Sequence, residues 1–145
     1  MIVSQLCVYP VKSCQGIDLA QVQVEMKGFL RDRQMMLVSG SGKFITQRQF
    51  PQLAKVIVEI VEPNITLKVV DASLPDLTFT PIATGRTIEV EIWRDRLQAI
   101  DQGDEVADWF QRLLDLDTGK ICRLVQQSPQ HNRILKQKYP SEEDI

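Results

Sequence analysis

The chain has 145 residues, of which 43% are hydrophobic and 25% are charged, and its formal net charge at pH 7 is −2. This length fits one domain with a single core, and the composition excludes disordered chains, collagen and small disulfide scaffolds. A net charge of −2 gives no overall positive potential that would attract nucleic acid. No apolar run approaches the ~18 residues of a membrane span. The three cysteines form no disulfide framework, so we expect a cytoplasmic protein that binds neither nucleic acid nor membranes.

Alternating apolar and polar residues predict β-strands over most of the first hundred residues. Every second residue of 22–26 and of 88–92 is apolar, which predicts strands with one buried face. Similar runs, separated by Gly, Pro, Asn and Asp, predict further strands at 2–9, 34–39, 43–47, 55–61, 65–70, 77–81 and 97–100. About nine short antiparallel strands at this spacing predict a mainly β, barrel-like fold.

One later segment has the period of a helix. Its apolar residues fall at i, i+3, i+4, i+7 and i+8, namely Val106, Trp109, Phe110, Leu113 and Leu114. That spacing predicts one amphipathic helix near 103–116, packed on the barrel, with Asp101 as its cap. A last strand is predicted at 120–126. We therefore expect 1–127 to form the β-barrel domain and 128–145, which is too polar to build a core, to be a tail or a linker toward a missing domain.

The first candidate site is the turn that follows the first predicted strand. The chain turns at Pro10 and continues through Lys12, Ser13 and Cys14 to Gly16. Such a turn exposes backbone N–H groups beside an ammonium and a hydroxyl, which suits an anionic oxygen, phosphate above all. The spacing is not that of a P-loop. The same residues also fit a solvated hairpin with an incidental lysine.

Two further segments contribute arginines. Arg31-Asp32-Arg33 follows the strand predicted at 22–26, and Arg48 lies just before Pro51. A guanidinium binds phosphate or carboxylate bidentately, although such a triplet is also typical of a surface ion-pair cluster. If the three segments converge on one rim of the barrel, they form a basic pocket in an acidic protein from Lys12, Arg31, Arg33 and Arg48.

Cys14 is a candidate nucleophile or sulfur carrier because it lies near Lys12. However, the only histidine, His131, lies in the polar tail, so no Cys/His pair is indicated. We interpret Cys14 as a turn residue, and Cys7 and Cys122 as core or strand residues. No cluster of His and Cys has metal-ligand spacing, so neither catalytic residues nor a protein-only metal site is predicted.

Together these segments resemble the N-terminal β-barrel domain of the MOSC family (molybdenum cofactor sulfurase C-terminal domain). The most specific match is Tyr9-Pro10-Val11-Lys12-Ser13-Cys14-x-Gly16. The match extends to about residue 126 through Gly28…Arg31-Asp32-Arg33, Thr46-x-Arg48-Gln49, Pro51-x-Leu53, Asp101-x-Gly103-Asp104…Trp109-Phe110…Leu113 and Arg123-Leu124-Val125. One departure is Met35, where the family often has a tryptophan; this exchange alters packing rather than anion contacts.

The resemblance implies a molybdenum cofactor (molybdopterin) shared with a C-terminal MOSC domain, whose cysteine ligates the metal. It also implies that Lys12, Ser13 and Arg33 hold the cofactor phosphate and pterin; Arg31 and Arg48 transfer less directly and also fit structural roles. Full-length members reduce N-hydroxylated compounds with electrons from separate electron-transfer proteins, or are assigned to sulfur transfer. We expect no catalysis from this chain alone.

Two alternatives stay open at this point. One is a stand-alone, non-catalytic β-barrel module whose basic rim binds an anionic ligand or a protein partner. The other is sulfur transfer through Cys14.

Overall fold

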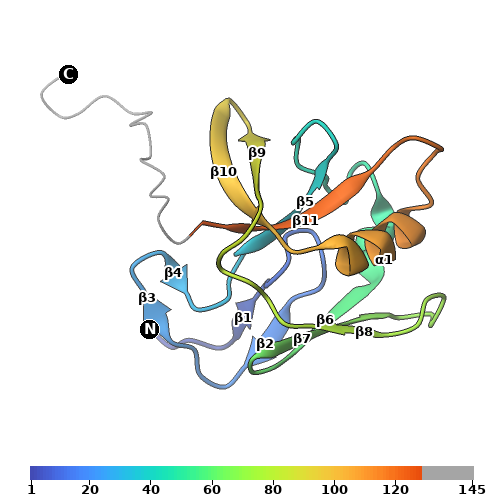
Figure 1. The fold of residues 1–145 in the computed structure, drawn as a ribbon. Helices are drawn as coiled ribbons and strands as arrows, with labels where there is room; N and C mark the ends of the chain where they lie inside the picture. The colour runs from blue at the N-terminus through green and yellow to red at the C-terminus, as the bar shows by residue number, and fades with distance from the viewer. Residues whose placement is uncertain (129–145) are drawn as a thin grey trace, which may run out of the picture.

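The computed structural model describes residues 1–128. These residues form eleven short β-strands, one 3₁₀ helix and one α-helix, which confirms the predicted mainly β, barrel-like fold (Figure 1). Within this part of the chain, neither helix is long and apolar enough to cross a membrane. Apart from Ser128, the predicted tail 128–145 lies outside the described residues.

The central sheet has four antiparallel strands in the order β5-β11-β10-β9. Their bounds are Met35–Ser39 for β5, Cys122–Gln127 for β11, Asp95–Asp101 for β10 and Thr87–Ile92 for β9. Apolar and polar side chains alternate along β9, which gives it one apolar face. The first four residues of β5 are all apolar and buried, because one face of this strand packs in each of the two cores. Predicted strands at 34–39, 88–92, 97–100 and 120–126 are thereby confirmed within one or two residues.

This sheet curls on itself and is closed by the segment around Gly42–Ile45. Phe44 bridges to Val38 of β5, and Lys43 bridges to Glu91 of β9. Gly42 has a φ of +82°, and a Cβ at this position would collide with the carbonyl of Glu89, so only glycine allows the close approach. The enclosed interior holds a small core of Met36, Val38, Val90, Ala99 and Val125.

A second layer packs on the outer face of this sheet. Three antiparallel strands form it: β6 (Val56–Val61), β7 (Asn64–Val69) and β8 (Leu77–Phe79). The 3₁₀ helix η1 (Pro51–Lys55) leads into β6. The larger core lies between the layers and includes Leu37, Leu53, Ile65, Leu67, Phe110 and Leu124, none of which is exposed.

The α-helix α1 (Asp104–Leu114) covers this core, contacting β11, β8 and η1. Val106, Trp109, Phe110 and Leu114 of its predicted stripe are buried, which confirms the helix. The predicted cap is wrong: the N-cap residue is Gly103. The carboxylate of Asp101 instead forms two hydrogen bonds with the Arg123 guanidinium, at 2.6 and 3.1 Å, and accepts one from the Gly103 N–H at 3.2 Å.

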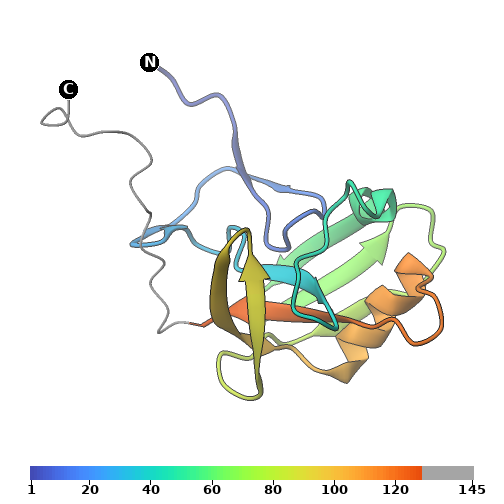
Figure 2. The same ribbon diagram turned by 90° about the horizontal axis from the view of Figure 1, so that it is seen from above.

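The N-terminal segment lies on the opposite side of the molecule from α1 (Figure 2). It contains two small hairpins, β1 (Leu6–Val8) with β2 (Ile17–Leu19) and β3 (Val24–Glu25) with β4 (Gly28–Phe29). The loop between β1 and β2 joins both layers, because Lys12 N–H donates to the Met35 carbonyl and Gln15 N–H donates to the Val56 carbonyl. This loop carries the first candidate site.

Three strand predictions need correction. The predicted strand at 2–9 shrinks to the three residues of β1, and Ile2 and Val3 are exposed. The predicted strand at 22–26 shrinks to the two residues of β3, and Val24 and Met26 are 72% and 104% exposed rather than buried, because β3 pairs only with β4. The predicted strand at 43–47 forms only the two isolated bridges described above, and a turn at Thr46, whose carbonyl accepts from the Gln49 and Phe50 N–H groups, ends its extended course.

Candidate anion-binding site

The loop after β1 is held in place by short backbone hydrogen bonds. Arg33 N–H donates to the Tyr9 carbonyl at 2.6 Å, and Met35 N–H donates to the Pro10 carbonyl at 3.2 Å. The Tyr9 N–H in turn donates to the Asp32 carboxylate at 2.9 Å. The Arg31-Asp32-Arg33 triplet therefore lies directly beside the loop that carries Lys12.

Ser13 lies at the sharpest point of this loop. Its φ of +75° is a left-handed conformation, which costs free energy for a residue with a Cβ. The Gln47 side chain fixes it by donating to the Ser13 carbonyl at 2.7 Å. Among the described residues, neither the hydroxyl nor the backbone N–H of Ser13 has a hydrogen-bond partner, so both are available to an incoming acceptor.

Arg33 also has a positive φ, of +50°. Its Nη1 donates to Asp32 Oδ2 at 2.7 Å, and its guanidinium carbon lies 5.1 Å from the centre of the Tyr9 ring. The charge of Arg33 is thus held in a defined direction while its side chain stays 60% exposed. A guanidinium has five N–H donors, so the ion pair with Asp32 leaves several for a ligand.

Lys12 and Arg48 complete the positive charge. The Lys12 ammonium lies 4.3 Å from the centre of the Phe44 ring, a cation–π contact. Arg48 is exposed on the loop after Phe44 and Ile45, and no hydrogen bond or ion pair holds its guanidinium among the residues that the structure describes. An exposed, unpaired guanidinium is ready to bind an anion.

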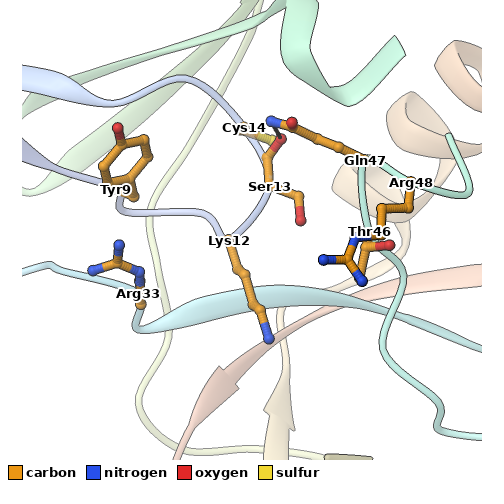
Figure 3. Close-up of a pocket in the computed structure, with 8 residues that line it drawn as sticks. All are labelled: Tyr9, Lys12, Ser13, Cys14, Arg33, Thr46, Gln47 and Arg48. Atoms are coloured by element: carbon orange, nitrogen blue, oxygen red, sulfur yellow. Dashed lines mark hydrogen bonds between the residues drawn. The ribbon is translucent and has the colours of Figure 1, made fainter. Parts of the chain in front are cut away.

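These side chains surround one pocket of about 310 Å³ (Figure 3). In Figure 3, Lys12 lies between Arg33 on one side and Ser13 and Arg48 on the other. The full lining consists of Tyr9, Lys12, Ser13, Cys14, Arg33, Thr46, Gln47 and Arg48. Among the described residues, three cations and no carboxylate lie in this wall, so it is positive in a chain whose net charge is −2. Such a wall attracts and orients an anion with several oxygens.

The structure brings together four of the five candidate residues: Lys12, Ser13, Arg33 and Arg48. It does not bring Arg31 to them. The Arg31 guanidinium forms a bidentate pair with Glu62, at 2.7 and 3.0 Å, and lines a different cavity beside Ile17 and Ile60. Arg33 thus lines the pocket while it pairs with Asp32, whereas the pair with Glu62 holds Arg31 in the other cavity.

Sequence reasoning did not single out Tyr9, Thr46 and Gln47 as lining residues. Only their position in the sequence could have identified them, since each lies within three residues of Lys12 or Arg48, in the same motifs. A pattern of charges finds the donors of a site, but not the neutral side chains that hold the loop, such as Gln47.

Cys14 lines the pocket but is only 1% exposed. Burial raises the pKa of its thiol to about 12, because the thiolate loses solvation in the apolar core. The thiol is therefore neutral at pH 7 and a poor nucleophile, which argues against sulfur transfer through Cys14. Cys122 is buried in β11, and desolvation likewise raises its pKa to about 12, against a smaller opposing effect of Arg123.

The chain is similar to several known proteins over most of its length. It is 31% identical to a molybdenum cofactor sulfurase of Bombyx mori over 95% of this chain and 17% of that protein. It is 29% identical to mitochondrial amidoxime-reducing component 1 of Mus musculus over 88% of this chain and 38% of that protein. The chain thus spans well under half of either relative.

The solution structure of a protein from Bordetella bronchiseptica has a similar fold, with a TM-score of 0.60 at 15% identity, over 85% of this chain and 88% of that one. The model of the MOSC N-terminal beta barrel domain matches residues 1–117, a range that contains every lining residue of the pocket. The chain belongs to the family of MOSC N-terminal β-barrel domains, as the motif around Lys12 predicts.

Proposed function

We propose that this chain is one half of a molybdenum-cofactor site, in which Lys12, Ser13, Arg33 and Arg48 hold the cofactor phosphate and one edge of its pterin. The observation that carries the proposal is the cluster of three cations around a strained, donor-rich turn in an otherwise acidic chain. Left-handed residues other than glycine persist where the fold constrains them and often mark ligand sites.

The residues of the pocket fit a phosphate. A phosphate monoester has three terminal oxygens, each a strong acceptor, and carries nearly two negative charges at pH 7. Lys12, Arg33 and Arg48 offer charge-assisted donors, and Ser13 offers a hydroxyl and a backbone N–H at the same turn. Gln47 supports this arrangement because its side-chain amide donates to the Ser13 carbonyl and so engages the acceptor of this turn.

The pocket fits only part of a pterin cofactor. Its volume of about 310 Å³ is at the low end of the ~300–1,000 Å³ typical of ligand sites. We infer that a second body supplies the opposite wall, and that this body is a C-terminal MOSC domain with a cysteine that ligates the metal. The chain then binds and orients the cofactor without touching the reacting atoms.

When bound, the molybdenum cofactor supplies metal-centred redox and group-transfer chemistry. The relatives include a cofactor sulfurase and an amidoxime-reducing component. Reduction of N-hydroxylated compounds, with electrons from separate electron-transfer proteins, and sulfur transfer are therefore the two reactions proposed for the complete protein. In either case the contribution of Lys12, Ser13, Arg33 and Arg48 is to anchor the anionic end of the cofactor.

The test is cofactor occupancy in a protein that joins this chain to a C-terminal MOSC domain. Arg33→Ala should lower occupancy, measured as molybdenum and pterin per chain, because a hydrogen bond to a charged group contributes about 1.5–3 kcal/mol. Arg96→Ala is the matched control, since Arg96 is an exposed arginine on β10 that pairs with Glu89 and does not line the pocket. Wild-type occupancy in the Arg33→Ala protein contradicts the proposal.

A second measurement distinguishes the proposed cofactor site from the alternative, a stand-alone module that binds an anion. Inorganic phosphate is titrated into the 145-residue chain and into its Arg48→Ala variant, with backbone amide shifts as the readout. Binding that requires Arg48, combined with no retention of cofactor by the joined protein, favours the stand-alone module over the cofactor site.

A further inference from the structure

A second cavity opens at the mouth of the small barrel, next to the anion pocket. It has a volume of about 240 Å³ and lies between β5, β9, β10 and β11. Its wall is mainly apolar and includes Met36, Val90, Ile92, Leu97 and Val125. Ile92 and Leu97 are only partly buried, so the apolar interior of the barrel is open to a ligand at this end.

Two cations lie on the edge of this apolar cavity. Lys12 and Arg33 line it as well as the anion pocket, so the two cavities are neighbours that share a wall. The other polar lining residues in the described part of the chain are glutamines, and none of these lining residues is a carboxylate. Asp32, which pairs with Arg33, lies outside the lining. An apolar interior with a positive edge is complementary to an amphipathic anion.

Trp93 also lines this cavity and is unusual in two ways. It is 72% exposed, and it has a φ of +58°. Ile92 pairs with Asp95, so Trp93 is the first residue of a two-residue hairpin loop, the position that takes glycine in hairpins with positive φ there. A bulky aromatic residue in this conformation is a genuine outlier.

Phe44 lies outside the lining of the cavity but contacts two residues that line it, Trp93 and Lys12. Its ring centre lies 5.9 Å from that of Trp93, at an interplanar angle of 54°, and 4.3 Å from the Lys12 ammonium. These distances lie in the range of favourable aromatic and cation–π contacts. Phe44 therefore supports the indole and the ammonium on the same side of the barrel mouth.

We propose that the barrel mouth binds a small aromatic carboxylate, with its ring among Ile92, Leu97 and Trp93 and its carboxylate at Lys12 and Arg33. The cavity is larger than the ~150 Å³ that accommodates benzene in an apolar protein core. It holds one ring and a short substituent. This inference goes beyond the proposed cofactor site and does not depend on it, because the cavity is formed by this chain alone.

The probe is phenylacetate, titrated into the 145-residue chain. The chain has two tryptophans, and their indole N–H signals serve as reporter and reference. Trp93 lines the cavity, whereas Trp109 is 4% exposed and donates to the Pro75 carbonyl in the larger core. We expect a saturable shift of the Trp93 signal only. No shift, or equal shifts of both signals, overturns the proposal.

The preference for a negatively charged ligand is tested with 2-phenylethylammonium, which has the same ring as phenylacetate and the opposite charge. Phenylacetate should bind at least about tenfold more tightly, since two cations lie at the edge of the cavity. Equal affinities would mean that the ring alone is recognised, and would overturn the assignment of a carboxylate.

Two variants, studied by calorimetry, test whether phenylacetate binds in this cavity. Trp93→Gly suits the positive φ and should fold, but bind phenylacetate about fivefold more weakly. Leu97→Gln should weaken binding about tenfold. Val61→Ala, which removes an exposed apolar side chain on β6, is the control and should bind as wild type.

Neither Trp93 nor Leu97 lines the anion pocket, so both variants should still bind inorganic phosphate as the wild-type chain does. Loss of phosphate binding alone therefore bears on the proposed cofactor site. Phenylacetate affinity unchanged in both variants overturns the present inference.

Discussion

At the scale of single residues, the anion pocket contains backbone strain. Ser13 has a φ of +75°, and within residues 1–128 no hydrogen bond of its side chain requires serine there. Replacing a left-handed residue by glycine removes about 1–2 kcal/mol of strain, against about 0.5–1 kcal/mol of chain entropy. We therefore expect Ser13→Gly to raise the free energy of unfolding in urea by up to about 1 kcal/mol while weakening phosphate binding.

A matched control exists for this exchange. Ala72 is exposed in the turn after β7, far from the pocket in sequence, and has a φ of +54°. Ala72→Gly should stabilise the chain by a similar amount and leave phosphate binding unchanged. If Ser13→Gly is stabilising and binds phosphate as tightly as wild type, the serine hydroxyl plays no part in binding.

The cysteines give a second prediction at this scale. With its pKa raised from 9.0 to about 12, the Cys14 thiol has roughly a thousandth of the ordinary thiolate fraction at pH 8. Iodoacetamide should thus modify the partly exposed Cys7 first, and Cys14 and Cys122 only after denaturation. Peptide mapping by mass spectrometry checks this order. Rapid modification of Cys14 in the folded chain would reopen the possibility of sulfur chemistry there.

At the scale of elements, the alternating pattern predicts a strand correctly where that strand pairs along its full length. The prediction is wrong where the neighbouring segments offer no partner strand. Strands β6 and β7 follow their period-two patterns because they pair along their full length. Residues 22–26 have the same pattern, yet pair only as the short β3–β4 hairpin, so their apolar face stays exposed. The three residues of β2 are too few to give a pattern at all.

In the candidate site, too, the features set by local sequence could be predicted, and those set by distant residues could not. Charge and turn chemistry were enough to select Lys12, Ser13, Arg33 and Arg48, since these residues lie in short loops next to Pro or after predicted strands. The direction of Arg31 was not predictable, because its partner Glu62 lies in the β6–β7 hairpin, 31 residues away. Barrel closure at Gly42–Ile45 was not predictable either, because it depends on the bridge between Lys43 and Glu91, which are distant in the sequence.

The ion pairs of Arg123, which join β11 to β10 through Asp101 and to α1 through Asp104, give a prediction for these elements. Asp101 is the only buried charged residue among those described, at 4% exposure, and Arg123 is its bidentate partner. Arg123→Ala leaves that carboxylate buried and unpaired, so we expect a loss of about 3–5 kcal/mol in urea unfolding. Asp104→Ala removes only the exposed partner of Arg123 and should cost about 0–1 kcal/mol. Equal effects would contradict this view of the network.

At the scale of the whole molecule, the fold depends on a strand beyond the matched family segment. The family model ends at residue 117, whereas β11 starts at Cys122. In the central sheet β11 lies between β5 and β10, with Cys122, Leu124 and Val125 buried (Figure 1). Without β11, the strands β5 and β10 have no partner on the facing edge, and both cores lose part of their wall.

This dependence can be tested by truncation. A chain that ends at residue 117 should not fold, because removal of a central strand exposes two apolar strand edges and the buried side chains of β11. A chain that ends at residue 128 keeps every contact described above and should unfold cooperatively in urea. Circular dichroism and amide dispersion distinguish the two states. A folded 1–117 chain would mean that β5 and β10 can pair directly, which in turn would reshape the barrel mouth and remove the cavity assigned to phenylacetate.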